Sequence, residues 1–149
     1  MIRVADASDL PALTSLIERY WEFERIEGFD AAHITALLNE LFRTPDRGQI
    51  WVAKIDGRSV GYVLAVYLFS LEHGGMMAEI DEFFVVPEKR SLKIGTALLE
   101  AATTAMAQHG ITHVQLQLGR RNSHGQRFYE KHGFEALSAY GLLHRSLRR

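Results

Sequence analysis

The sequence predicts an α/β (α+β) fold in which one mixed β-sheet is flanked by about four helices. Some segments carry apolar residues at alternate positions, as strands do, and longer ones carry them every three or four residues, as helices do. Near the C-terminus a helical segment joins two extended ones, which is the order of a parallel crossover. The 149 residues include no linker rich in Pro, Gly and Ser, so a single domain, 1–149, is expected.

The N-terminal part is predicted to hold a short strand and two helices. Residues 2–5 are extended, and Ser8 can cap a helix whose apolar residues keep helical spacing as far as Phe23. A second helix is predicted over residues 31–42, because the apolar residues there share one side and Pro45 stops the helix.

A hairpin and a third long strand are predicted next. Residues 50–55 and 60–69 read as strands, and Asp56 with Gly57 forms the tight turn between them. Residues 78–86 form another strand, which Pro87 closes.

The remaining elements complete the predicted sheet. A helix over 94–109 stops at Gly110, and a strand over 114–118 follows it. The sequence then predicts a helix over 122–132 and extended pieces at 134–137 and 142–147. The expected sheet therefore has six to seven strands.

The composition excludes several classes of protein. With no cysteine, the chain has no disulfide framework, thiolate zinc site or cysteine nucleophile. The seven histidines lie on different predicted elements without metal-site spacing, so no metal is expected. The N-terminus does not resemble a signal peptide, and the most apolar stretch, 60–71, is too short to cross a bilayer. We therefore expect a cytoplasmic protein with no membrane partner.

The net charge of −1 conceals an uneven distribution. Residues 1–88 carry a formal charge of −8 and residues 89–149 carry +7. The pattern indicates two partners of opposite charge, although uneven surface charge is the simpler alternative.

A basic turn joins the strand at 78–86 to the helix at 94–109. Helix starts present unpaired N–H groups and the positive end of the helix dipole, which favour anions. Lys89, Arg90 and Lys93 add positive charge there, so a phosphate ligand is predicted, with a solvated basic loop as the alternative.

Two motifs resemble those of the GNAT superfamily of N-acetyltransferases, which use acetyl-CoA. Residues 90–95, Arg-Ser-Leu-Lys-Ile-Gly, are similar to the family's pyrophosphate loop, (Gln or Arg)-x-x-Gly-x-(Gly or Ala), with Lys93 in place of the middle glycine. Ser91 also stands where glycine is common. Residues 122–134, from Asn122 to Phe134, look like the family's Asn-x(5)-Phe-Tyr-x-x-x-Gly-Phe stretch.

The resemblance implies a set of acetyl-CoA contacts. The backbone of the predicted strand at 78–86 pairs with the pantetheine, and residues 91–96 surround the pyrophosphate. Asn122 helps to hold the pantetheine or simply caps its own helix. The implied cofactor-binding residues are Phe83, Val85, Arg90, Ser91, Leu92, Lys93, Ile94, Gly95, Thr96 and Asn122.

The resemblance also implies direct attack of a neutral amine on the thioester, which requires a general base and a general acid. Tyr129 is the implied acid, with a core phenol as the alternative. Alternation along the strand puts Glu79 and Asp81 on one face as the two candidate bases. Glu82 falls on the other face and ranks third, unless a bulge exchanges the faces. A solvated strand end, or an ion pair with the basic turn, is the alternative for these acids.

The acceptor is expected to be a primary amine of a small cationic molecule, such as a polyamine, a diamine or an aminoglycoside-like compound. Acids and aromatic residues alternate around the first helix and its connection, and both attract ammonium groups. The candidate substrate-binding residues are Glu22, Glu24, Glu27 and Glu82. The alternative is a helix with its acids in solvent and its aromatic residues in the core.

Other functions stay open at this level. The acceptor could be a protein or peptide amine, or the chain could be a non-catalytic acyl-CoA-binding module. A nucleic-acid adaptor built on the basic C-terminal part is a further hypothesis, but we expect no nucleic-acid partner. A homodimer is expected by analogy with such folds alone. The sequence identifies neither the amine nor the acyl length.

Overall fold

The protein is described by a computed structural model that covers residues 1–148, except for the side chain of Ser91. The chain forms two compact units, Met1–Gln117 and Leu118–Arg149, which are described in turn. The first unit contains β1 (Ile2–Val4), η1 (Ala7–Asp9), α1 (Leu10–Glu24), α2 (Ala31–Arg43), β2 (Gly48–Ile55), β3 (Arg58–Ser70), β4 (Gly75–Val85), η2 (Pro87–Leu92), α3 (Ile94–Gln108) and β5 (Val114–Leu116).

The sheet is mixed, as the sequence predicts, but within the described residues it has five strands rather than six or seven. Its order is β1-β2-β3-β4-β5, and each pair is antiparallel except β4 with β5. The second unit holds one helix, α4 (Ser123–Lys131). The extended pieces predicted at 134–137 and 142–147 pair with no strand in the described part of the chain. Apolar alternation therefore overcounted the strands there.

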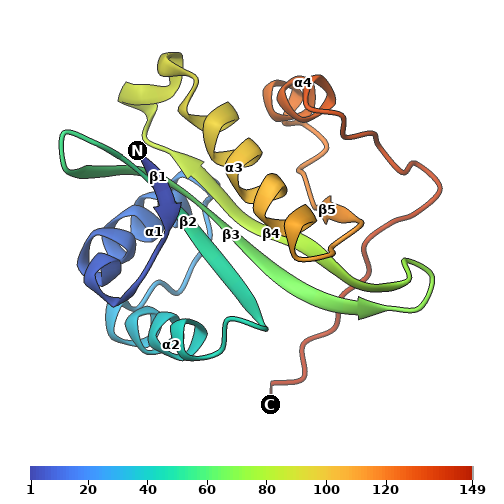
Figure 1. Cartoon of the computed structure of the whole chain (residues 1–149), viewed down its shortest axis with the longest axis horizontal. Helices are drawn as coiled ribbons and strands as arrows, with labels where there is room; N and C mark the ends of the chain where they lie inside the picture. The colour runs from blue at the N-terminus through green and yellow to red at the C-terminus, as the bar shows by residue number, and fades with distance from the viewer. Residues whose placement is uncertain (149) are drawn as a thin grey trace. The chain divides into compact units, whose positions relative to one another are not determined.

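Helices cover both faces of the sheet (Figure 1). A Cβ added at Gly61 of β3 would lie 3.2 Å from Leu98 Cδ1 of α3. The ring of the next residue, Tyr62, instead contacts Tyr20 of α1, with 6.4 Å between the ring centroids. Because successive residues of a strand face opposite sides, α1 packs on one face and α3 on the other.

The start of α1 differs from the predicted Ser8 cap. Asp6 accepts a hydrogen bond from the backbone N–H of Ser8 and caps η1, which leads directly into α1. The side chain of Asp9, at the end of η1, is fully buried and pairs with Arg3 and Lys54. Asp6, two residues before the predicted cap Ser8, therefore provides the cap, because a 3₁₀ turn precedes the α-helix.

The strand β4 has a bulge at Asp81. Its neighbour β3 pairs Leu64 with Glu82 and Ala65 with Ile80, so Asp81 is the extra residue. Cross-strand partners share a face of the sheet. The bulge therefore places Glu79 and Glu82 on the same face of the sheet, toward α1. The prediction from strict alternation, that these two residues lie on opposite faces, was wrong.

The strands β4 and β5 part before β4 ends. Their parallel ladder runs from Ala78 with Val114 to Ile80 with Leu116, where β5 ends. β4 continues as far as Val85, where it leads into η2. The half of β4 nearest η2 therefore lies beyond the β5 ladder.

Candidate functional site

A hydrogen-bonded carboxylate lies at the centre of the α1 face of β4. Glu82 accepts hydrogen bonds from the Trp21 indole Nε1 and the Tyr62 hydroxyl, each at 2.8 Å. Burial raises the pKa of the Glu82 carboxyl, the two donors lower it in part, and the nearby Asp81 raises it. Burial, and then the neighbouring Glu82, also raises the pKa of Tyr62. Glu82 is therefore a positioned carboxylate whose affinity for a proton is increased.

The other two strand acids have different surroundings. Asp81 is exposed at the bulge, yet partial desolvation and then the charge of Glu79 raise its pKa. Glu79 accepts a hydrogen bond at 3.2 Å from the Gln115 amide of β5. Three carboxylates on four successive residues thus create a negative strip along β4, and two of them have raised pKa values.

Acids and aromatic rings gather at the C-terminal end of α1. Glu22 and Glu24 are exposed in its last turn, and Glu27 is exposed in the connection to α2. The last turn has no basic residue, although the negative end of a helix dipole favours one. Trp21 packs edge-on against Phe29, with the ring centroids 5.8 Å apart. The acids at this end of α1 can therefore attract a cation, and the C-cap residue Arg25 offsets part of their negative charge.

The turn predicted to hold an anion forms η2 and the start of α3. Lys93, which replaces the motif's glycine, adopts a left-handed backbone with φ 59° and ψ 24°. That conformation suits glycine and costs other residues about 1–2 kcal/mol. The side chain of Lys93, the N-cap residue of α3, makes no capping hydrogen bond. The loop therefore keeps a glycine-like shape and presents a helix start suited to a pyrophosphate.

The residues of this loop differ in exposure. Leu92 and Lys93 are exposed, Ile94 is buried, and Gly95 and Thr96 are half-buried. The Ser91 side chain lies outside the described part of the structure.

Arg90 has local contacts that the motif does not predict. Its Nε donates to the Val85 carbonyl at 2.9 Å, and its guanidinium lies over the rings of Phe23 and Phe84, 4.7 and 5.6 Å from their centroids. The nearby Arg19 of α1 forms a two-pronged contact with Glu88 of η2 at 3.1 and 3.2 Å. Two arginines therefore attach η2 to α1, and backbone N–H groups and lysines remain as the anion-binding groups of the loop.

The second motif forms α4 and the residues after it. Asn122 caps α4, because its Oδ1 accepts the Gly125 N–H at 2.8 Å. Tyr129 is half-buried, and its ring packs against those of Phe128 and Phe134, with centroids 5.2 and 5.4 Å away. The phenylalanines of the motif therefore hold the Tyr129 ring within its own unit.

The structure adds two residues to those singled out from the sequence. Tyr62 and Trp21 hold the Glu82 carboxylate, but neither belongs to a motif. A tyrosine inside an apolar strand is a signal, because a buried hydroxyl needs a partner. Which acid it meets depends on the bulge at Asp81.

A family model identifies the chain. The model described as the acetyltransferase (GNAT) family matches residues 10–134. The chain belongs to this family. It is thus a GNAT acetyltransferase, and enzymes of this family generally take the acyl group from acetyl-CoA.

Individual relatives agree with the GNAT assignment. An uncharacterized N-acetyltransferase of Bacillus subtilis is 29% identical over 90% of this chain and 89% of its own length. Another, of Archaeoglobus fulgidus, is 36% identical, but the match covers 56% of this chain and 58% of that protein. An aminoalkylphosphonate N-acetyltransferase of Salmonella typhimurium is 34% identical over 54% of this chain and 52% of that enzyme.

A solved structure has the same fold. An integron cassette protein from a salt-marsh metagenome superposes with a TM-score of 0.86 and 28% identity, covering 99% of this chain and 91% of that one. Among the described residues, no helix of this acetyltransferase is long and apolar enough to cross a membrane.

Proposed function

We propose that the chain transfers an acetyl group from acetyl-CoA to the primary amine of a small cationic molecule, such as a polyamine, a diamine or an aminoglycoside-like compound. The observation that carries the proposal is the Glu82 carboxylate, held by Trp21 and Tyr62 beside the acidic end of α1. The Salmonella relative, whose name gives an aminoalkylphosphonate, supports a small primary amine as the acceptor but not its cationic character, because a phosphonate is anionic.

The acetyl-CoA site is proposed at the half of β4 beyond Ile80 and at the turn into α3. Phe83 and Val85 would face the pantetheine with their backbones. The backbone N–H groups at the start of α3 and the charge of Lys93 would receive the pyrophosphate. Acetyl-CoA supplies the thioester whose carbonyl carbon is attacked.

Glu82 is proposed as the group that takes one proton from the substrate ammonium, directly or through one water, which leaves the neutral amine that attacks. The raised pKa of Glu82 brings it closer to neutral pH, which suits a general base. The neutral amine then forms the C–N bond as the C–S bond breaks, and Tyr129 is proposed to give a proton to the leaving thiolate. The second proton leaves the new amide nitrogen and restores the Tyr129 hydroxyl, directly or through water. Asp81 and Glu79 remain candidates for the base, while Glu22, Glu24 and Glu27 are proposed to attract the substrate's other cationic groups.

The test is CoA release from acetyl-CoA with a panel of amines, for the wild type and Glu82→Gln. We expect turnover with small polycationic amines, and a decrease in kcat/KM of about 10² to 10⁴ for the variant. Protection of the variant by acetyl-CoA in a thermal melt should equal that of the wild type, because the amide keeps the size of the side chain.

The control is Glu100→Gln, which removes an exposed carboxylate from α3. Its activity should match that of the wild type. If no amine releases CoA while acetyl-CoA still protects the protein, the binding-module hypothesis replaces the enzyme. If Glu82→Gln keeps full activity, Asp81 or Glu79 takes the role of the base.

A further inference from the structure

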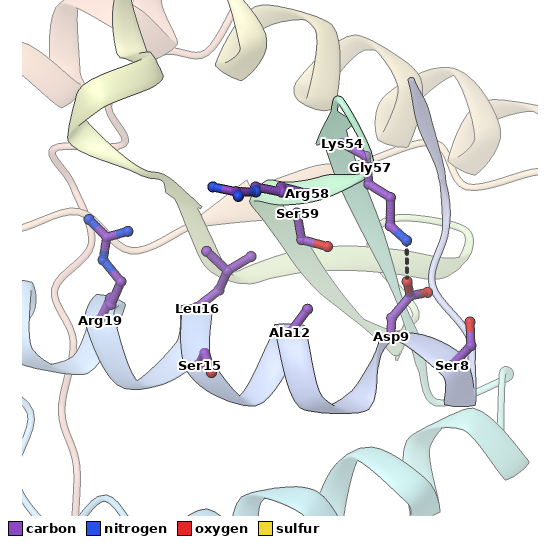
Figure 2. A pocket seen from close by; sticks show the side chains of 10 residues that line it. All are labelled: Ser8, Asp9, Ala12, Ser15, Leu16, Arg19, Lys54, Gly57, Arg58 and Ser59. Carbon is purple, nitrogen blue, oxygen red and sulfur yellow. Dashed lines mark ion pairs between the residues drawn. The ribbon is translucent and has the colours of Figure 1, made fainter.

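A pocket of about 420 Å³ lies between α1 and the β2–β3 hairpin (Figure 2). Its lining includes Arg19 of α1, Lys54 of β2, and Arg58 and Ser59 of β3. Among the described side chains, none that the family resemblance assigns to acetyl-CoA lines it, and neither does any of the strand acids. The pocket therefore has a lining of its own, and it adjoins the proposed donor site through Arg19, which also pairs with Glu88 of η2.

The charge of this pocket is positive, although residues 1–88 as a whole are acidic. Asp9 is its one lining acid. The Asp9 carboxylate accepts two hydrogen bonds from Arg3, both at 2.8 Å, and lies 3.3 Å from the Lys54 amine. The positive charges of Arg3 and Lys54 thus share the single negative charge of Asp9. Within residues 1–148 Arg58 forms no ion pair, so its charge is uncompensated.

A polar atom without a partner lies in the same wall. The Ser59 Oγ is buried and has no hydrogen-bond partner within the described residues. Buried hydroxyls are normally satisfied. Because this oxygen is closed to solvent, the Ser59 side chain has to rotate before its hydroxyl can donate to a ligand in the pocket. Figure 2 shows the Ser59 hydroxyl and the Arg58 guanidinium on the hairpin side of the pocket, with Arg19 and Leu16 across from them on α1.

We propose that this pocket binds an oxyanion, specifically a phosphate group. The exposed Arg58 guanidinium can pair with two phosphate oxygens at once, and the Ser59 hydroxyl can donate to a phosphate oxygen after rotation of its side chain. The volume exceeds that of inorganic phosphate, so the group can be free phosphate or part of a larger phosphate ester. Lys54 and Arg19 add positive charge while keeping their own partners.

Thermal unfolding with inorganic phosphate tests the proposal. Phosphate at ten times its dissociation constant should raise the Tm of the wild type by about 4–5 °C over sodium chloride of equal ionic strength. Arg58→Gln should remove most of that rise. The control Arg43→Gln, which removes an exposed arginine at the end of α2, should keep all of it.

Three results would overturn the proposal. The first is that phosphate up to 50 mM leaves the wild-type Tm unchanged, and the second is that Arg58→Gln responds like the wild type. The third is that saturating acetyl-CoA abolishes the phosphate effect, because phosphate would then occupy the donor site. The rise in Tm with ribose 5-phosphate is then compared with the rise with inorganic phosphate. A larger rise with the ester shows that the pocket binds the phosphate group of a larger ligand.

Discussion

The Tyr62 hydroxyl offers a sharp test of the proposed base. It donates to Glu82 Oε1 at 2.8 Å and thereby favours the ionised carboxylate. Tyr62→Phe removes only this donor from a fully buried ring. A hydrogen bond to a charged group contributes about 1.5–3 kcal/mol, and one pKa unit corresponds to 1.36 kcal/mol. The pKa of Glu82 should therefore rise by about 1–2 units.

The assay is the pH dependence of kcat/KM with one amine and acetyl-CoA. A base must be deprotonated, so activity falls on the acid side as Glu82 gains its proton. The acid limb of Tyr62→Phe should lie about 1–2 pH units above that of the wild type. Tyr67→Phe is the control, because this hydroxyl of the same strand donates to Gln49 instead, at 2.6 Å. Coincident acid limbs for Tyr62→Phe and the wild type would refute the role of Glu82.

Three further predictions concern other parts of the chain. Asp9→Asn should cost about 2 kcal/mol of unfolding free energy at pH 7, because Arg3 lowers the pKa of the buried Asp9 from 3.8 to about 2. In denaturant titrations the wild type should lose this advantage as the pH falls from about 4 to 2, and equal unfolding free energies at pH 7 would contradict it. Tyr129→Phe should lower kcat by about 10² or more while acetyl-CoA protection persists, and unaltered turnover would remove Tyr129 from the mechanism. Lys93→Gly should raise the unfolding free energy by about 0.5 kcal/mol, since relief of the left-handed backbone exceeds the entropy that glycine adds to the unfolded chain. It should also weaken acetyl-CoA binding at low salt, and a loss of stability above about 1 kcal/mol would show that Lys93 is not strained.

The order of the elements could be predicted from the sequence because apolar spacing and turn residues are local signals. The β2–β3 turn at Asp56 and Gly57 and the stop of α3 before Gly110 are examples. The bulge at Asp81 could not be predicted, because it depends on how β3 and β4 pair. This bulge decides which acidic residues of β4 lie on the same face of the sheet.

The turn between β4 and α3 could also be predicted only in part. Its motif predicts an anion site, and Lys93, which stands at the glycine position of the motif it resembles, has the left-handed backbone that suits a glycine. The sequence could not show that the Arg90 side chain packs on Phe23, a residue 67 positions earlier. Long-range contacts of this kind depend on the fold and leave no local pattern.

The two arginine contacts between α1 and η2 have a consequence for kinetics. Arg19 with Glu88, and Arg90 with Phe23, join the acid-bearing helix to the turn proposed to hold the donor's pyrophosphate. A donor that fixes η2 would then also fix the end of α1, and by linkage the acceptor would strengthen donor binding by the same factor. An exposed ion pair contributes at most about 1 kcal/mol and an exposed cation–π contact about 0.5–1 kcal/mol, so the mutual effect of the two contacts should not exceed about thirtyfold. Because this coupling is reciprocal, each substrate would bind more tightly in the presence of the other, in whichever order they arrive.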